Sequence, residues 1–227
     1  MIRTITGKAL ALVAAISLVA AAAALAEVSV YDNDFSSRAE FSEIFKSGGG
    51  KECHRRYRAK GRAMLVSVKD GDTTCSFRAP VMGDAELPDH SVIVDGRVLK
   101  RTEKSVRGGA FVELTVRAGG GGVGYSLRVF PQKRRFELRR GPAGAGFPAA
   151  GTSEAINKIN ERNQLRLVAT GARVQAFVNR EEVANVTDPD PAQVSGRKVR
   201  FAVGNAKQKS KDVVATLKQV AVAVPER

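Results

Sequence analysis

Apolar and polar residues alternate along most of the chain with the two-residue period of half-buried β-strands. In the clearest run, Ala110, Val112, Leu114 and Val116 fall on one side and the residues between them on the other. The same alternation predicts strands over 125–129, 136–138, 165–169, 174–178 and 199–203, with further strands over 64–68, 73–77, 92–99, 183–187 and 213–224. A helical turn fits only 153–160, with Ser153 as its cap.

Short turn sequences separate these runs. Asp70-Gly71 predicts a hairpin, and Asp95-Gly96 predicts either a second hairpin or a bulge inside one long strand. The glycines at 119–122 predict a loop between strands. Many strands joined by short turns, without βαβ alternation, predict an all-β fold: an antiparallel β-sandwich in which each sheet has one buried and one solvated face.

The first 26 residues differ from the rest of the chain. Arg3 and Lys8 precede an uninterrupted run of small and apolar residues, which ends at the small-x-small site Ala24-Leu25-Ala26. This pattern predicts a cleaved signal peptide over 1–26, because the apolar run is short for a membrane span. Its removal would leave one domain, 27–227, in the periplasm or outside the cell, not transmembrane. That location disfavours nucleotide cofactors and genomic DNA as partners.

Two cysteines, Cys53 and Cys75, lie in the exported part. An oxidising compartment makes a disulfide between them the default interpretation, and it would close a loop of about 22 residues. A zinc site that uses the adjacent His54 is the alternative, but no ligand spacing supports it.

Several short motifs occur in an order that resembles a known group of domains. They are Tyr31-Asp32-Asn33-Asp34-Phe35-Ser36, Ala155-Ile156 followed by Asn163-Gln164-Leu165-Arg166-Leu167, Phe177-Val178-Asn179 with Thr187-Asp188, Ser195-Gly196-Arg197-Lys198-Val199 and Leu217-Lys218-Gln219-Val220-Ala221-Val222. In this order they resemble bacterial secreted LamG-like jelly rolls of the concanavalin A-like lectin/glucanase superfamily, close to the 3-keto-disaccharide hydrolase-like domain. The resemblance covers about 34–222 and implies a concanavalin A-like jelly roll.

The chain departs from that group at defined positions. Arg180 replaces the usual hairpin glycine, and Lys218-Gln219 replaces Asp-Asn. The chain has no tryptophan, the residue that commonly stacks on sugar rings in carbohydrate-binding sandwiches. The superfamily includes lectins, glycosidases and adhesion modules, so the resemblance implies a fold and leaves the activity open.

Positive charge is the strongest chemical signal. The formal net charge is +14, and it falls to +12 without the leader. Candidate ligand-binding residues are the basic segment around Tyr57 and the cations that strand alternation places on non-core faces: Arg55, Arg56, Tyr57, Arg58, Arg117, Arg128, Arg135, Arg139, Arg166, Lys198 and Arg200. If they share one face, they would hold an anionic polymer. The alternative is that they only solubilise the protein and protect strand edges.

Catalytic and metal-binding patterns are weak. A glycosidase needs two carboxylates around the scissile bond; Asp84-Ala85-Glu86 reads as a loop and Glu181-Glu182 as a solvated turn. No catalytic residue is therefore assigned. Asp188 and Asp190 are candidates for a calcium site on a loop, although acids in such positions more often form turns.

Three functions remain open at this level. The first is an exported, non-catalytic module that binds carbohydrate or an anionic polymer of the cell envelope or medium. The second is a glycoside-active hydrolase or lyase, and the third is a structural or interaction domain without a small ligand. The pattern does not indicate an oligomeric state.

Overall fold

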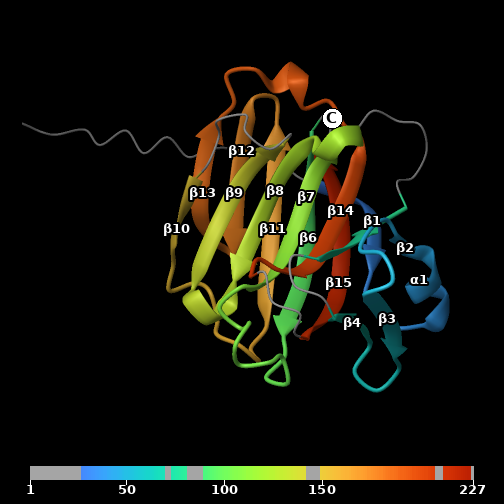
Figure 1. The fold of residues 1–227 in the computed structure, drawn as a ribbon. Coiled ribbons are helices and arrows are strands. Elements are labelled where there is room, and N and C mark those ends of the chain that lie inside the picture. The colour runs from blue at the N-terminus through green and yellow to red at the C-terminus, as the bar shows by residue number, and fades with distance from the viewer. Residues whose placement is uncertain (1–26, 70–72, 81–88, 142–148, 208–211, 226–227) are drawn as a thin grey trace, which may run out of the picture.

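The protein, described from a computed structural model, is built from two antiparallel β-sheets packed face to face (Figure 1). The structure describes residues 27–69, 73–80, 89–141, 149–207 and 212–225. The predicted leader, the Asp70-Gly71 hairpin and the Asp84-Ala85-Glu86 loop lie outside these residues. In the described part, no helix is long and apolar enough to cross a membrane.

Sheet A has the strand order β13-β12-β11-β6-β15-β4-β3, and β1 also pairs with β15. Its strands are β1 (Glu27–Asn33), β3 (Cys53–Arg58), β4 (Ala63–Val68), β6 (His90–Val98), β11 (Asn163–Thr170), β12 (Arg173–Val178), β13 (Glu181–Thr187) and β15 (Val213–Pro225). The long strand β15 lies in the middle of the sheet, where it pairs with β6 along one side and with β4 and then β1 along the other.

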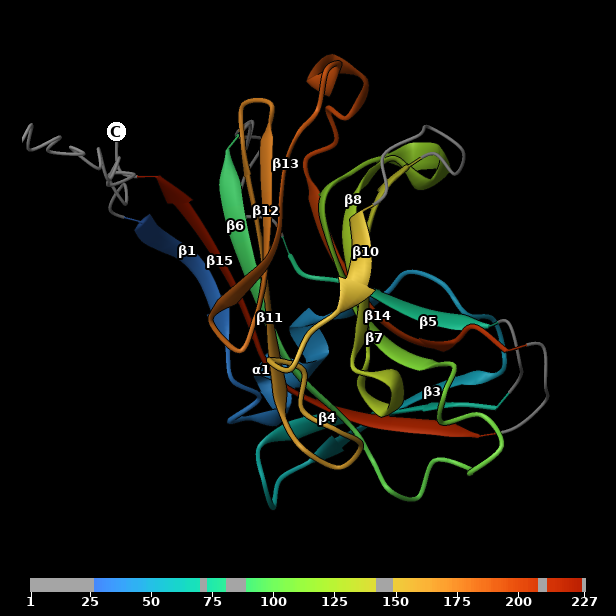
Figure 2. The same cartoon turned by 90° about the vertical axis from the view of Figure 1, so that its left-hand side faces the viewer.

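Sheet B has the strand order β10-β9-β8-β7-β14-β5-β2. Its strands are β2 (Phe45–Lys46), β5 (Thr74–Arg78), β7 (Ala110–Ala118), β8 (Gly124–Phe130), β9 (Arg135–Gly141), β10 (Ala149–Thr152) and β14 (Lys198–Asn205). The outer face of sheet B points toward the viewer in Figure 1. In Figure 2 the strands rotate progressively, from upright β10 and β13 to β5 and β4 lying across, which is the ordinary sheet twist.

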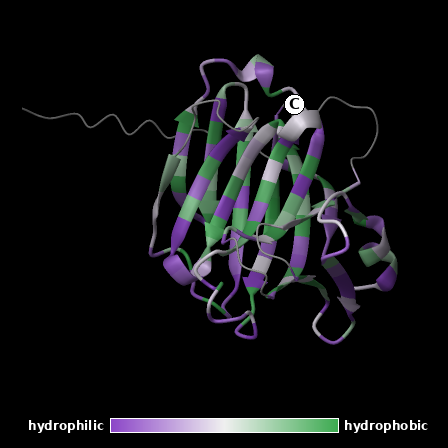
Figure 3. Cartoon of the chain, in the orientation of Figure 1, coloured by the Kyte–Doolittle hydropathy of each residue, from purple (hydrophilic) through white to green (hydrophobic). Residues whose placement is uncertain are grey.

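The core lies between the two sheets and consists of the inward side chains of both. Figure 3 shows apolar and polar positions alternating along the strands, as the sequence predicts. Leu114, Leu127 and Leu138 from sheet B are fully buried, as are Leu165 and Leu167 from sheet A. Their burial follows from the pleat, because alternate side chains of a strand leave the sheet on opposite faces.

The strands predicted from alternation are confirmed, and four elements with weaker patterns were missed. β1, β2, β3 and β10 are short or lie in polar sequence, where alternation gives no clear apolar side. The described residues also include one α-helix, α1 (Arg38–Glu43), where none was expected. Its signal is the pair Ser37 and Glu40: the Ser37 side chain accepts from the Glu40 N–H, and Glu40 accepts from the Ser36 N–H, a variant of the capping box.

Two other sequence expectations are resolved by the structure. Residues 153–160 form turns and no helix, although the Ser153 hydroxyl caps the N–H of Ala155. Asp95 and Gly96 lie inside the single strand β6. The irregularity there belongs to the partner strand β15, where the register shifts between Leu217 and Gln219.

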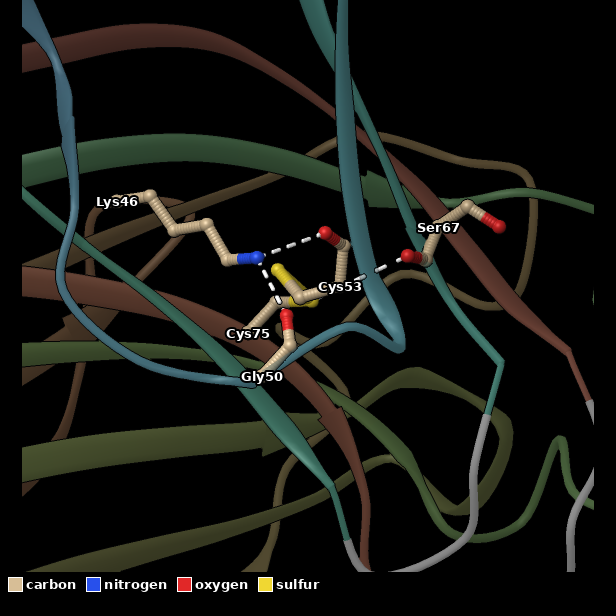
Figure 4. The surroundings of a disulfide bond; sticks show 5 residues. All are labelled: Lys46, Gly50, Cys53, Ser67 and Cys75. Carbon is tan, nitrogen blue, oxygen red and sulfur yellow. Dashed lines mark hydrogen bonds between the residues drawn. A yellow bond between two sulfur atoms is a disulfide. The ribbon is translucent and has the colours of Figure 1, made fainter.

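The predicted Cys53–Cys75 disulfide is present and joins the two sheets (Figure 4). Cys53 begins β3 of sheet A and Cys75 lies in β5 of sheet B, with their Cα atoms 5.4 Å apart. Lys46 lies beside the bond and donates to the carbonyl oxygen of Cys53 at 3.0 Å. Gly49 approaches so closely that a Cβ there would lie 2.8 Å from the Cβ of Cys53, so this turn requires glycine.

Replacing the disulfide should lower stability without changing the fold. The double substitution Cys53→Ala/Cys75→Ala should reduce the free energy of unfolding by about 3 kcal/mol, because a 22-residue loop is no longer closed in the unfolded chain. Urea unfolding followed by circular dichroism measures this. The matched control is the reduced wild-type protein, which should unfold at the same midpoint as the variant; a variant as stable as the oxidised wild type would contradict the expectation.

Candidate functional site

A row of side chains, polar except for Phe45 at one end, crosses the outer face of sheet B. Each residue in the row is the direct cross-strand partner of the next, so all of them lie on one face. The cross-strand row consists of Arg139, Ser126, Thr115, Arg200, Arg78 and Phe45, from β9, β8, β7, β14, β5 and β2. Because adjacent strands are about 4.8 Å apart, the row is a continuous strip across the sheet.

Two other arginines on this face are already matched by acids. Arg128 forms an ion pair with Glu113 at 2.6 Å, and Arg135 forms one with Glu137 at 2.5 Å. Both guanidinium groups also stack on buried phenylalanine rings: Arg128 lies 4.0 Å from the ring centre of Phe111, and Arg135 lies 4.2 Å from that of Phe130. Arg128 and Arg135 therefore stabilise the sheet, and their charges are compensated.

Three cations with no acid partner among the described residues lie together toward one end of the row, and Arg139, at the opposite end, has none either. Arg78, Lys198 and Arg200 line a cavity of about 340 Å³ together with Ser47, Ser76 and the glycines at 119–121. The described residues that line this cationic pocket include no acid. The guanidinium of Arg200 donates to the carbonyl oxygen of Gly119, which anchors it against the glycine loop. The pocket therefore has a concentrated positive potential and suits an anionic group.

The backbone around the pocket depends on glycine. Gly121 and Gly122, in the short 3₁₀ turn η1 (Gly120–Gly122), have φ of +62° and +81°, a region that favours glycine. Gly196, two residues before Lys198, lies so close to β7 that a Cβ there would be 2.3 Å from the carbonyl oxygen of Arg117. Glycine at 196 thus lets that backbone segment approach β7, while the glycines at 121 and 122 permit the left-handed turn beside the pocket.

An exposed aromatic ring lies next to the pocket. Phe45 is 50% exposed, and the guanidinium of its cross-strand partner Arg78 lies 5.5 Å from the ring centre. β2 follows α1, and Arg55 from β3 holds this segment by donating to the carbonyl oxygens of Ile44 and Phe41. Burial lowers the pKa of Arg55, whose guanidinium also lies 4.7 Å from the Phe41 ring centre. Arg55 is therefore a support for the segment that presents Phe45.

The basic segment around Tyr57 is split by strand alternation. Arg55 and Tyr57 face α1, where the Tyr57 hydroxyl donates to the carbonyl oxygen of Ser36 at 3.0 Å. Arg56 and Arg58 are exposed and point to the other face of sheet A. The run that looks like one cluster in the sequence is thus divided between two faces of an edge strand.

The remaining predicted arginines are distributed as follows. Arg139 is exposed on the outer face of sheet B, together with Arg128, Arg135 and Arg200. Arg166 lies on the opposite side of the sandwich, on sheet A, where it pairs with Glu27 at 2.7 Å. The structure therefore brings four of these five arginines to one face.

The prediction for Arg117 is wrong. Alternation predicts its side chain on a non-core face, and the structure buries it. The register of β7 against β14 shifts between Lys198 and Arg200, and this bulge gives Arg117 a φ of +48°. Its side chain turns to the end of the sandwich, where it pairs with Asp89 at 3.2 Å and donates to the carbonyl oxygen of Gly171 at 2.9 Å. An extra residue in one strand reverses the alternation that the prediction relies on.

Asp188 is the centre of a buried polar network. Its Oδ2 accepts from the Tyr125 hydroxyl at 2.5 Å and from Arg140 at 2.8 Å, and its Oδ1 accepts from the N–H of Asp190 at 2.9 Å. Burial acts to raise the pKa of Asp188, but the hydrogen bond from Tyr125 and the contacts with Asp190 and Arg140 outweigh it and lower that pKa. Burial and the same carboxylate raise the pKa of Tyr125.

This network supplies the hydrogen-bond and ion-pair partners of the buried Asp188 carboxylate. Both of its oxygens are occupied by donors, and a cationic guanidinium is one of them. Among the residues that the structure describes, no group of three or more His, Cys, Asp and Glu side chains is arranged to hold a metal ion. Asp188 through its carboxylate, and Asp190 through its backbone N–H and carbonyl, tie the end of β13 to β8 and β9.

Sequence reasoning named Lys198 and Arg200 but missed Arg78, Phe45 and the glycine loop as parts of one site. Arg78 ends β5 and Phe45 lies just beyond α1. They meet only because β2 pairs with β5 and β5 pairs with β14. The sequence gives no clear signal for Phe45, because it directly follows the apolar Ile44 and lies four residues after Phe41.

No family model matches this chain, and no curated protein matches it in sequence. Solved structures do resemble it. A protein of unknown function with a galectin-like fold from Bacillus subtilis aligns with a TM-score of 0.60 and 15% identity, over 87% of this chain and 97% of its own. The carbohydrate-binding module CBM66 from Bacillus subtilis aligns with a TM-score of 0.53 and 15% identity, over 78% and 92%.

An alginate lyase, A1-II′ of polysaccharide lyase family 7, aligns with a TM-score of 0.54 and 13% identity, over 78% of this chain and 85% of its own. At such identities the likeness concerns the fold alone. The fold expected from the sequence motifs, a concanavalin A-like jelly roll, is confirmed.

Removing the Asp188 charge should destabilise the protein in a pH-dependent way. Asp188→Asn leaves Arg140, whose side chain is 9% exposed, without its counter-charge, and should cost about 3 kcal/mol at pH 7. Because the folded-state pKa of Asp188 lies below its unfolded value, wild-type stability from this carboxylate is present at neutral pH. It is lost as the pH falls through the folded pKa.

The difference between wild type and Asp188→Asn should therefore shrink in acid, which urea unfolding at neutral and acidic pH measures. Asp190→Asn is the matched control, since its side chain has a hydrogen bond only to Gln193 among the described residues; it should change stability by less than about 0.5 kcal/mol. A difference that stays constant with pH would contradict the role given to the Asp188 charge.

Proposed function

We propose that this protein is an exported, non-catalytic binding module that holds carbohydrate or an anionic polymer of the cell envelope or medium on the outer face of sheet B. The observation that carries this proposal is the cationic pocket, where Arg78, Lys198 and Arg200 meet without an acid among the described lining residues. Arg128 and Arg135 on the same face each have a glutamate partner, whereas the three pocket cations have none among the described residues.

The geometry suits a polymer better than a single ion. The cross-strand row continues from the pocket to Arg139 through the hydroxyls of Thr115 and Ser126. Hydroxyl groups and cations spaced along one strip can contact successive units of a chain by hydrogen bonds and charge. Phe45 adds an apolar surface at the pocket end, which the flat C–H face of a sugar ring can cover.

The structural neighbours support a carbohydrate ligand. One is a carbohydrate-binding module, and another is a lyase that acts on alginate, an anionic polysaccharide. The predicted signal peptide and the Cys53–Cys75 disulfide both fit a protein that works outside the cytosol.

A glycoside-active enzyme is the second candidate, and one observation bears on it. Glu113 and Glu137 both face Arg128 in register on the outer face of sheet B, so they lie two strands, or about 10 Å, apart. That is close to the separation in inverting glycosidases. Each carboxylate is ion-paired with an arginine, however, so neither is available to act as a proton donor or base toward a substrate. The binding module is therefore the favoured function.

Removing pocket cations should weaken binding of an anionic polysaccharide. Arg78→Ala/Lys198→Ala should bind alginate at least about tenfold more weakly than wild type, because hydrogen bonds to charged groups contribute roughly 1.5–3 kcal/mol each. Calorimetry at about 0.05 M and about 0.5 M salt measures the affinity, and the wild-type affinity should fall at high salt. Lys100→Ala/Arg101→Ala, an exposed pair outside the pocket, is the control and should leave binding unchanged.

Two results would overturn the proposal. One is wild-type binding that does not respond to salt or to the pocket substitutions. The other is an activity of the wild type that releases new reducing or unsaturated sugar ends from a polysaccharide. If Glu113→Gln abolishes that activity, the protein is an enzyme instead.

A further inference from the structure

The pocket contains a like-charge pair that no acid among the described residues compensates. Arg78 and Arg200 are direct cross-strand partners on β5 and β14. Like charges in opposite positions of an antiparallel pair are destabilising, and no glutamate or aspartate of the described residues lines the pocket beside them. Destabilising arrangements such as this like-charge pair are typical of functional sites, where a bound ligand supplies the missing counter-charge.

The two guanidinium groups are held, each by a different contact. Arg200 donates to the carbonyl oxygen of Gly119, and Arg78 lies 5.5 Å from the ring centre of Phe45. A planar guanidinium fork binds a planar carboxylate through two parallel hydrogen bonds, and holding it in advance lowers the entropy lost on binding. Lys198, exposed at the rim, adds charge without such geometry.

The exposed Phe45 ring restricts the chemistry of the ligand that carries the anionic group. It is one of two large hydrophobic side chains that are exposed among the described residues, and it directly follows Arg78 in the cross-strand row. A ligand that uses both features needs a carboxylate at the arginine pair and an apolar face one strand away. A uronic acid has this combination, since its ring carries the carboxylate and presents a face of C–H groups.

We infer that the cationic pocket is a uronate site, in which Arg78 and Arg200 bind the carboxylate of one sugar unit and Phe45 stacks on a ring of the same chain. This inference rests on the proposed function and narrows its ligand to carboxylated polysaccharides. A sulfated or phosphorylated polymer would satisfy the charges but would gain less from the planar forks.

The test compares oligouronates with matched chains that lack the free carboxylate. Calorimetry on the full exported chain would use oligogalacturonate and alginate oligomers, their methyl esters, and dextran sulfate. We expect at least one oligouronate to bind, and its methyl ester to bind at least tenfold more weakly. Arg78→Lys keeps the charge but removes the fork, and should weaken oligouronate binding at least fivefold while dextran sulfate binding changes less than twofold.

Phe45→Ala tests the stacking contact separately. It should weaken oligouronate binding at least threefold and leave dextran sulfate binding unchanged. Val28→Ala is the matched control, because Val28 is the other exposed large hydrophobic residue and lies on β1 of sheet A. Both side chains are half exposed, so the thermal midpoint should stay at the wild-type value and confirm that the variants fold.

The outcomes separate this inference from the function on which it rests. If dextran sulfate binds as tightly as the oligouronates, or if Arg78→Lys and Phe45→Ala leave oligouronate binding intact, the uronate assignment is wrong and the anionic-polymer function survives. If Arg78→Ala/Lys198→Ala binds every one of these polymers as wild type does, both are wrong.

Discussion

The two-residue alternation of side chains along each strand is the constraint on which the rest of this structure depends. Each sheet must turn its apolar side chains toward the shared core, so the intervening charged residues are forced to the outside. Leu127 is buried for the same reason that its neighbours Ser126 and Arg128 are on the outer face. Cross-strand register then decides which outward side chains become neighbours, and this second step turns scattered cations into a site.

The outer face of sheet B shows two ways of handling positive charge. Toward one side, Arg128 and Arg135 are paired with glutamates and stacked on phenylalanine rings, so charge and apolar surface are both covered. Toward the other, Arg78 and Arg200 oppose each other across β5 and β14, and the pocket beside them is open. Cations that only solubilise a protein are most stable when they are far apart. Solubility alone therefore does not account for two arginines placed opposite each other.

The segment that completes the pocket is held by contacts of several kinds. The disulfide ties β3 to β5, and Arg55 of β3 holds the end of α1 through backbone carbonyls. Phe45 follows directly and pairs with Arg78. The position of the one exposed aromatic ring in the row is thus determined by a covalent bond between sheets, a half-buried cation and a two-residue strand.

The amino-acid sequence by itself determined the strands with strong alternation, the sandwich and the cysteine pair, because each of these depends on local periodicity or on the only partner available. It did not determine α1, whose signal is a single capping pair, or the orientation of Arg117, since a bulge reverses alternation at one residue. Only the tertiary structure decided that Arg78, Arg200 and Phe45 are cross-strand neighbours. They come from three strands that are distant in the chain, and register between such strands is set by packing of the whole core.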